Sequence, residues 1–156
     1  PYAAAKWGLI GLTKSMAMTY STTRRVEFAE TDMAGIMHFS NFYRWMETVE
    51  HEFFRSLGLS IHMRIDDQDV GWPRLETSCK FKRPLKFEEE ATVRLSIEEI
   101  SAKTITYSFK IEKEENGQQL HIARGKMTTV CVTFESGTGK LKAIPIPKII
   151  REKIDP

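Results

Sequence analysis

The sequence predicts an α+β protein in which one long helix is wrapped by a five-stranded antiparallel sheet. Apolar residues at helical spacing between positions 39 and 57 indicate the helix. From residue 75 to residue 134, apolar and polar residues largely alternate with a period of two, which is typical of strands with one buried face. A helix packed on the buried face of a single sheet would bury both sets of apolar side chains.

The first elements are expected to be a short strand from Val26, a polar loop around Asp32 and Gly35, and the long helix. One helix face carries large apolar side chains, namely Phe42, Trp45, Met46, Val49, Phe53 and Leu57. Other positions fall mostly off this face and are predicted to meet water or an interface, namely Arg44, Glu47, Glu50, His51 and Arg55. Gly58 follows the last apolar residue, where helices commonly end in a left-handed cap.

The later elements follow from alternation and turn residues. Residues 59–70 are polar and predicted to be irregular, and the remaining four strands are expected within 75–83, 93–97, 105–111 and 121–134. Asn116-Gly117 is a strong signal for a tight hairpin turn, and Gly125 suggests a bulge in the last strand. A short amphipathic helix is expected near the C-terminal end, where it carries Ile149, Ile150 and Ile154.

Composition narrows the function classes. A chain of 156 residues with 41% hydrophobic content suits one domain with a sizeable core. Its 23 basic and 21 acidic residues, a formal charge of +2, argue against a dedicated nucleic-acid binder. Cys79 and Cys131 are far apart and are expected to be free thiols of a cytoplasmic protein. No apolar run approaches the roughly 20 residues that a membrane span requires.

Residues 1–22 do not match the pattern of the remaining chain. The words YAAAK and GLIGLTKSMA resemble the active-site helix of short-chain dehydrogenases, with Tyr2 and Lys6 in the Tyr-x-x-x-Lys positions. No glycine-rich phosphate loop or alternating βαβ pattern accompanies this fragment, so we assign it no chemistry. We therefore expect residues 1–22 to be an N-terminal extension and residues 23–156 to form the domain.

A motif of the form E-T-D-x-x-G, followed by H-F-S-N-F-x-R-W-x-E, spans the loop and the start of the helix. It closely resembles the motif of hotdog-fold acyl-CoA thioesterases of the 4-hydroxybenzoyl-CoA thioesterase type. The matching positions are Asp32, Gly35, Asn41, Trp45 and Glu47. Glu30 and Phe42 replace residues of the family pattern, and the resemblance extends over nearly all of residues 23–150. It implies a hotdog fold and a thioester hydrolase that needs no cofactor.

The resemblance also implies roles for individual residues. Asp32 corresponds to the family's catalytic aspartate, which acts as nucleophile or as general base on water. The backbone N–H of Phe39, at the predicted helix N-terminus, corresponds to the donor that polarises the thioester carbonyl. Gly35 would let the backbone approach the ligand closely.

Further residues are candidates for substrate binding: His38, Asn41, Glu47, Lys82 and Arg83. Asn41 is better suited to fixing the loop by hydrogen bonding, and His38 competes with Asp32 as a general base. Lys82 and Arg83 belong to a basic cluster that could contact CoA phosphates or simply form a solvated strand face. Glu47 and His51 have the spacing of two metal ligands but lack a third, so we predict no metal site.

Two other functions are compatible with the sequence, an enoyl-CoA hydratase and a non-catalytic acyl-CoA binder. Hotdog enoyl-CoA hydratases use Asp and His, but their D-x-N-P-x-H motif places the pair one residue closer than Asp32 and His38. A non-catalytic acyl-CoA binder is also compatible with the fold. We expect a homodimer or homotetramer, because a single sheet leaves exposed strand edges. The acyl group of the substrate does not follow from the sequence.

Overall fold

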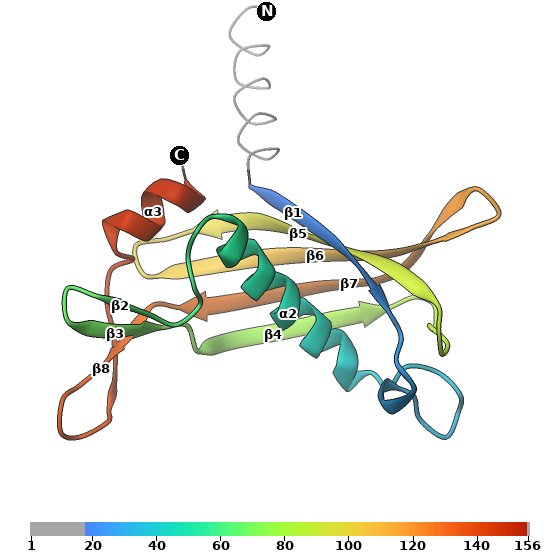
Figure 1. Cartoon of the computed structure of the whole chain (residues 1–156), viewed down its shortest axis with the longest axis horizontal. Coiled ribbons are helices and arrows are strands. Elements are labelled where there is room, and N and C mark those ends of the chain that lie inside the picture. Colours follow the sequence, from blue (N-terminus) through green and yellow to red (C-terminus); the bar gives the residue numbers. More distant parts are fainter. Residues whose placement is uncertain (1–17, 156) are drawn as a thin grey trace, which may run out of the picture.

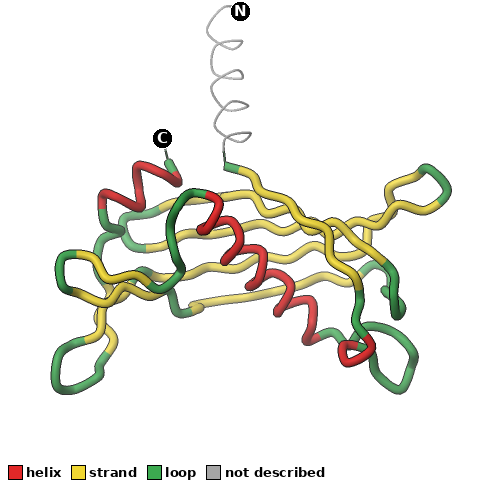
Figure 2. The backbone as a smooth tube through the Cα atoms, in the orientation of Figure 1, coloured by secondary structure: helices red, strands yellow, loops and turns green. Residues whose placement is uncertain are grey.

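The computed structural model describes residues 18–155, and Figures 1 and 2 show its arrangement. The elements before the main run of strands are β1 (Thr19–Arg25), the 3-10 helix η1 (Phe28–Glu30), α2 (Ser40–Ser56), β2 (Met63–Ile65) and β3 (Gln68–Gly71). The remaining elements are β4 (Arg74–Phe81), β5 (Glu90–Ile100), β6 (Thr104–Glu115), β7 (Gln118–Val130), β8 (Val132–Phe134), β9 (Leu141–Ala143) and α3 (Lys148–Ile154).

The larger sheet has five antiparallel strands in the order β1-β5-β6-β7-β4, and α2 crosses one face of it (Figure 1). Alternate side chains of the central strand β6 point toward α2 and are fully buried, namely Ile105, Tyr107, Phe109 and Ile111. From the helix, Trp45, Met46 and Val49 fill the same core. The α+β class is therefore confirmed, and the core lies between the helix and the sheet.

Gly125 lies on β7 directly beneath the Met46 side chain of α2. A Cβ atom at this position would lie 2.1 Å from the Met46 Sδ atom, far inside van der Waals contact. Gly125 pairs in regular register with Phe109 and Cys79, so the predicted bulge at this residue is wrong. The register shift of β7 falls instead opposite Ile111 and Glu112. The glycine is needed because a helix side chain occupies the space above the strand.

The first strand lies earlier than the sequence indicated. Val26 was expected to open a strand, but β1 ends at Arg25 and pairs with β5 from Thr19 onward. Residues 19–22 are therefore part of the sheet, and the domain boundary at residue 22 must move to before Thr19. This strand lacks apolar alternation because Tyr20 is its only apolar residue. Residues 1–17, with the dehydrogenase-like fragment, lie outside the described residues.

A second sheet was not predicted. Its strand order is β2-β3-β8-β9. Strands β2 and β3 lie almost entirely within residues 59–70, which the sequence predicted to be irregular. The long strand expected from residue 121 to residue 134 is divided at Cys131, whose N–H donates to the Lys103 carbonyl at 2.7 Å. The strands of this sheet have only three or four residues, which is too short for a clear alternation of apolar and polar side chains in the sequence.

Several predicted turns are confirmed. The long helix ends at Ser56, and Gly58 beyond it has a φ of +75°, the left-handed conformation expected after a helix. Asn116 and Gly117 both have positive φ, as a type I′ hairpin turn between β6 and β7 requires. The C-terminal helix α3 is present, with Ile150 and Ile154 buried and Ile149 half exposed.

Candidate active site

The loop between η1 and α2 folds back on itself as a tight turn. Thr31 and Met37 form an isolated antiparallel bridge, and the Asp32 N–H donates to the Ile36 carbonyl at 3.0 Å. Gly35 donates to the Asp32 carbonyl at 2.9 Å and has a φ of +78°, which only glycine adopts without strain. The turn therefore presents Asp32 from a hydrogen-bonded frame.

Glu30 fixes this turn to the start of α2. One carboxylate oxygen of Glu30 accepts from the Trp45 indole N–H at 2.7 Å, and the other accepts from the Glu27 N–H at 2.8 Å. The Glu30 carbonyl accepts from the Asn41 side chain and from the His38 N–H, each at 2.8 Å. Asn41 therefore holds the loop, whereas the role of Glu30 was missed because the sequence showed it only as a departure from the family motif.

Asp32 is exposed and lies at the start of the turn. Its Oδ1 atom accepts from the Ala34 N–H at 2.8 Å, which sets the orientation of the carboxylate. Among residues 18–155, Oδ2 has no hydrogen-bond partner. One oxygen of the carboxylate is thus engaged by its own turn, and the second is accessible to a ligand or to water.

Helix α2 begins directly after this turn, with Phe39 in the position before its first residue. In the described part of the chain, the Phe39 N–H has no hydrogen-bond acceptor, as is usual for the first N–H groups of a helix. This N–H is therefore free to bind an oxygen atom, and the partial positive charge of the helix N-terminus favours a negatively charged one.

His38 lies between these two groups in the sequence, and its ring is engaged locally. Its Nδ1 atom lies 2.8 Å from the Ser40 hydroxyl and also accepts from the Ser40 N–H at 3.3 Å. The ring packs against Phe39 with centroids 4.5 Å apart. These contacts suit a residue that supports the first turn of the helix.

The end of β4 lies beside the same loop. Phe81, the last residue of β4, packs edge-on against Phe42 in the first turn of α2, with centroids 5.1 Å apart. The following segment pairs with the Asp32 turn, because Met37 donates to the Leu85 carbonyl at 2.7 Å. Lys82 and Arg83 are exposed within this segment. Arg83 is already held, since its Nη1 atom donates to the His121 carbonyl at 2.9 Å.

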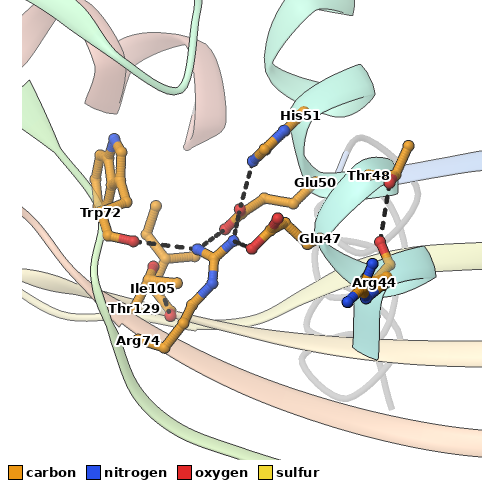
Figure 3. A network of polar contacts seen from close by, with 9 residues as sticks. All are labelled: Arg44, Glu47, Thr48, Glu50, His51, Trp72, Arg74, Ile105 and Thr129. Atoms are coloured by element: carbon orange, nitrogen blue, oxygen red, sulfur yellow. Dashed lines mark hydrogen bonds and ion pairs between the residues drawn. The ribbon is translucent and has the colours of Figure 1, made fainter. Parts of the chain in front are cut away.

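Glu47 belongs to a different group of side chains, in the middle of α2 (Figure 3). Its carboxylate lies 3.3 Å from Arg74 Nη2, and the same guanidinium makes a two-pronged contact with Glu50 at 2.7 and 3.1 Å. His51 Nε2 lies 3.9 Å from the Glu50 carboxylate. The structure therefore pairs Glu47 with β4 and gives it no contact with Asp32.

Glu50 was predicted to face water or an interface, and this prediction is wrong, because its side chain is 0% exposed. Burial raises the pKa of Glu50 to about 7, although the Arg74 guanidinium opposes this shift. The hydroxyl of Tyr107 is buried nearby, and burial together with the Glu50 carboxylate raises the pKa of Tyr107 well above its usual value. The sequence could not show this group, since Arg74 follows Glu50 by 24 residues.

Within residues 18–155, no three His, Cys, Asp or Glu side chains are grouped closely enough to hold a metal ion. None of the helices in that range is long and apolar enough to cross a membrane. Cys79 and Cys131 are free thiols, as expected, and burial raises the pKa of each to about 11.

A long helix packed on an antiparallel sheet is the architecture expected of a hotdog-fold domain. The chain belongs to the thioesterase-like superfamily, whose family model matches residues 26–154. This match confirms the resemblance inferred from the motif and, together with the relatives, the prediction of a thioester hydrolase.

Three relatives illustrate the match. A putative esterase of Aquifex aeolicus is 34% identical over 135 residues, which are 86% of this chain and 97% of the relative. A gentisyl-coenzyme A thioesterase of known structure is 34% identical in sequence and superposes with a TM-score of 0.71. The match covers 85% of this chain and 99% of the thioesterase chain. The 4-hydroxybenzoyl-CoA thioesterase of a Pseudomonas species is 22% identical over 134 residues, which are 85% of this chain and 94% of the relative.

Proposed function

We propose that this protein hydrolyses an acyl-CoA thioester to a free acid and CoA, with Asp32 as nucleophile or general base. One observation carries the proposal: Asp32 has an accessible Oδ2 atom in a hydrogen-bonded turn that leads directly into a helix N-terminus with a free Phe39 N–H. The names of two similar proteins, a gentisyl-CoA and a 4-hydroxybenzoyl-CoA thioesterase, support CoA thioesters as the substrate class.

The two groups divide the chemistry between them. As a general base, Asp32 takes a proton from water while the water oxygen attacks the thioester carbonyl. As a nucleophile, its carboxylate attacks the carbonyl directly and forms an anhydride that water then hydrolyses. In either case the carbonyl oxygen gains negative charge, which the Phe39 N–H and the helix N-terminus stabilise. The C–S bond then breaks, and CoA leaves as a thiolate that takes up a proton.

Other parts of the loop are proposed to support substrate binding. Gly35 permits the turn that presents Asp32, and Asn41 holds this turn against α2. Lys82 and Arg83 are proposed to contact CoA phosphates, because the segment that contains them pairs with the Asp32 turn. His38 is proposed to line the site without acting as the base, since Ser40 engages its Nδ1 atom. Glu47, bound to Arg74, is proposed to contribute only through the helix.

The proposal includes an assembly and a location. Strand β4 is an edge of the five-stranded sheet, and it carries the exposed apolar side chains of Leu75 and Phe81. An exposed apolar edge is a pairing surface, so we propose a homodimer or a homotetramer in which a second subunit pairs along the edge of β4 and forms part of the wall of the site. We propose a cytoplasmic location because both cysteines are free thiols.

The test is to offer the purified protein a panel of saturated and α,β-unsaturated acyl-CoAs. Thiol release, followed with a colorimetric reagent, measures hydrolysis, and loss of the enoyl absorbance measures hydration. Calorimetric titration with a non-hydrolysable acyl-CoA analogue measures binding. We expect thiol release without added metal or nucleotide. Hydration without thiol release would indicate a hydratase, and tight binding without turnover would indicate a non-catalytic acyl-CoA binder.

A further inference from the structure

The face of the five-stranded sheet that points away from α2 carries a row of basic side chains. Lys80 of β4 lies directly opposite Arg124 of β7, Arg124 lies opposite Lys110 of β6, and Lys110 lies opposite Arg94 of β5. We call these four residues the basic row. Residues that alternate with them along the strands, such as Phe109 and Leu95, are buried on the helix side. The basic row therefore faces outward from four adjacent strands.

This arrangement is unfavourable without an anion. Side chains directly opposite each other on neighbouring antiparallel strands are close, and like charges in such pairs are destabilising. Glu112 lies 3.9 Å from Arg94 Nη1 and 3.8 Å from Lys110 Nζ, so it offsets one end of the row. Within residues 18–155, Lys80 and Arg124 have no carboxylate within ion-pair distance. Two adjacent exposed cations thus remain without an anionic partner.

A groove of about 870 Å³ opens beside these two cations. Ser78, Ser108 and Ser96 line it from three strands, and in the strand register Lys126 lies between Ser78 and Ser108. Lys126 is paired with Glu98 at 3.2 Å, and the carboxylates of Glu99 and Asp155 also line the groove. Lys80 and Arg124 line its other part and form no ion pair within residues 18–155. Hydroxyl, ammonium and guanidinium donors are the groups that bind phosphate oxygens.

We propose that this groove is a second binding site, for a small phosphate-bearing ligand whose oxygens contact Lys80, Arg124 and the serine hydroxyls. The sheet separates it from the buried core and from α2, so it is distinct from the Asp32 turn. Two sources share the required chemistry: the nucleotide half of a CoA molecule and a free nucleotide. Binding of a free nucleotide does not depend on the proposed hydrolysis. Binding of the nucleotide half of CoA rests on the proposed function.

The first experiment measures binding on the full chain by calorimetric titration, with adenosine 3′,5′-bisphosphate and inorganic pyrophosphate as probes. The double variant Lys80→Ala/Arg124→Ala should bind at least one probe ten or more times more weakly than the unmodified protein. The matched control is Lys140→Ala/Lys142→Ala, which removes two exposed lysines near the other sheet and should leave binding unchanged. Equal binding by both variants, or no binding of either probe below about 1 mM, would overturn the proposal.

A thermal melt of the same double variant checks the reasoning independently of ligand. Because Lys80 and Arg124 are like charges in direct opposition, their removal should leave the melting temperature unchanged or raise it. A clear decrease would show that the two side chains stabilise the fold, and repulsion between Lys80 and Arg124 would then be excluded.

The second experiment separates the two ligand sources. The KM of the double variant is measured for an acyl-CoA and for the same acyl group on N-acetylcysteamine, which lacks the nucleotide. A tenfold rise for acyl-CoA alone assigns the site to the nucleotide of CoA. Unchanged KM values together with lost probe binding assign it to a free nucleotide. If the unmodified protein releases no thiol from either thioester, the proposed hydrolysis fails while the binding titration still decides this site.

Discussion

Asp32 and Glu50 are close in the sequence, but the fold leaves the first carboxylate exposed and buries the second. Asp32 is exposed and receives its hydrogen bonds from its own turn, whereas Glu50 is fully buried and is bound by Arg74 of the edge strand β4. A local turn keeps a charge accessible for chemistry, but a buried charge requires a partner from elsewhere in the chain. We propose that Asp32 acts in catalysis, whereas the contact between Glu50 and Arg74 attaches β4 to α2.

The substitution Asp32→Asn tests the exposed side of this comparison and should have the largest effect. Asparagine keeps the size of the side chain and its acceptor toward Ala34, but it removes the charge that attacks the thioester or takes the proton. Thiol release should fall about 10²- to 10⁴-fold, on the order of 3–5 kcal/mol of barrier. Acyl-CoA binding and the melting temperature should change little. More than a tenth of the original rate in the variant would remove Asp32 from the mechanism.

The substitution Arg74→Ala tests the buried contact between Arg74 and Glu50. Above about pH 7, where Glu50 is ionised, it leaves this carboxylate without its cationic partner inside the protein, which should cost about 3 kcal/mol and lower the melting temperature by on the order of 10 °C. Arg64→Ala is the matched control, since Arg64 pairs with the exposed Asp69 at 3.6 Å and such surface pairs contribute under about 1 kcal/mol. Equal melting temperatures for the two variants would show that the Glu50 contact does not hold β4.

The dependence of stability on pH gives a finer test of Glu50. Its pKa is raised from 4.5 to about 7 in the folded protein, so the folded state holds a proton that the unfolded state has lost. The corresponding stability is fully present below about pH 4.5 and is lost as the pH rises through about 7, up to about 3 kcal/mol. Glu50→Gln cannot ionise and should lack this loss.

Urea unfolding of both proteins at several pH values between 4.5 and 7.5 measures the difference. Other carboxyl groups titrate in both proteins, so only the difference between the two curves reports on Glu50. Parallel curves would mean that Glu50 ionises with its usual pKa despite its burial.

The smallest effect is expected for His38→Ala. Because the His38 ring is engaged by Ser40, the substitution should loosen the first turn of α2 and lower the rate of thiol release less than about tenfold. The pH–rate profile should keep its shape, since the proton-accepting group is unchanged. A loss as large as that of Asp32→Asn, with the acidic limb of the profile altered, would make His38 the general base instead.

Much of this protein follows from local sequence. The apolar stripe of α2, the left-handed Gly58 after it and the Asn116-Gly117 turn each depend on residues close together in the chain, and the structure has all three. The loop before the helix was also predicted, because its motif lies within one continuous stretch, residues 30–47. Local propensity and short-range spacing contain enough information for such features.

Features that depend on distant partners were decided only by the tertiary structure. Glu50 lies at a helix position that is exposed on pattern alone, and it is buried because β4 places Arg74 against it. Gly125 is required by Met46 on the helix above it, and the basic row exists only in the register of four strands. In each case the energy of a residue depends on groups brought near it by folding, which sequence spacing does not encode.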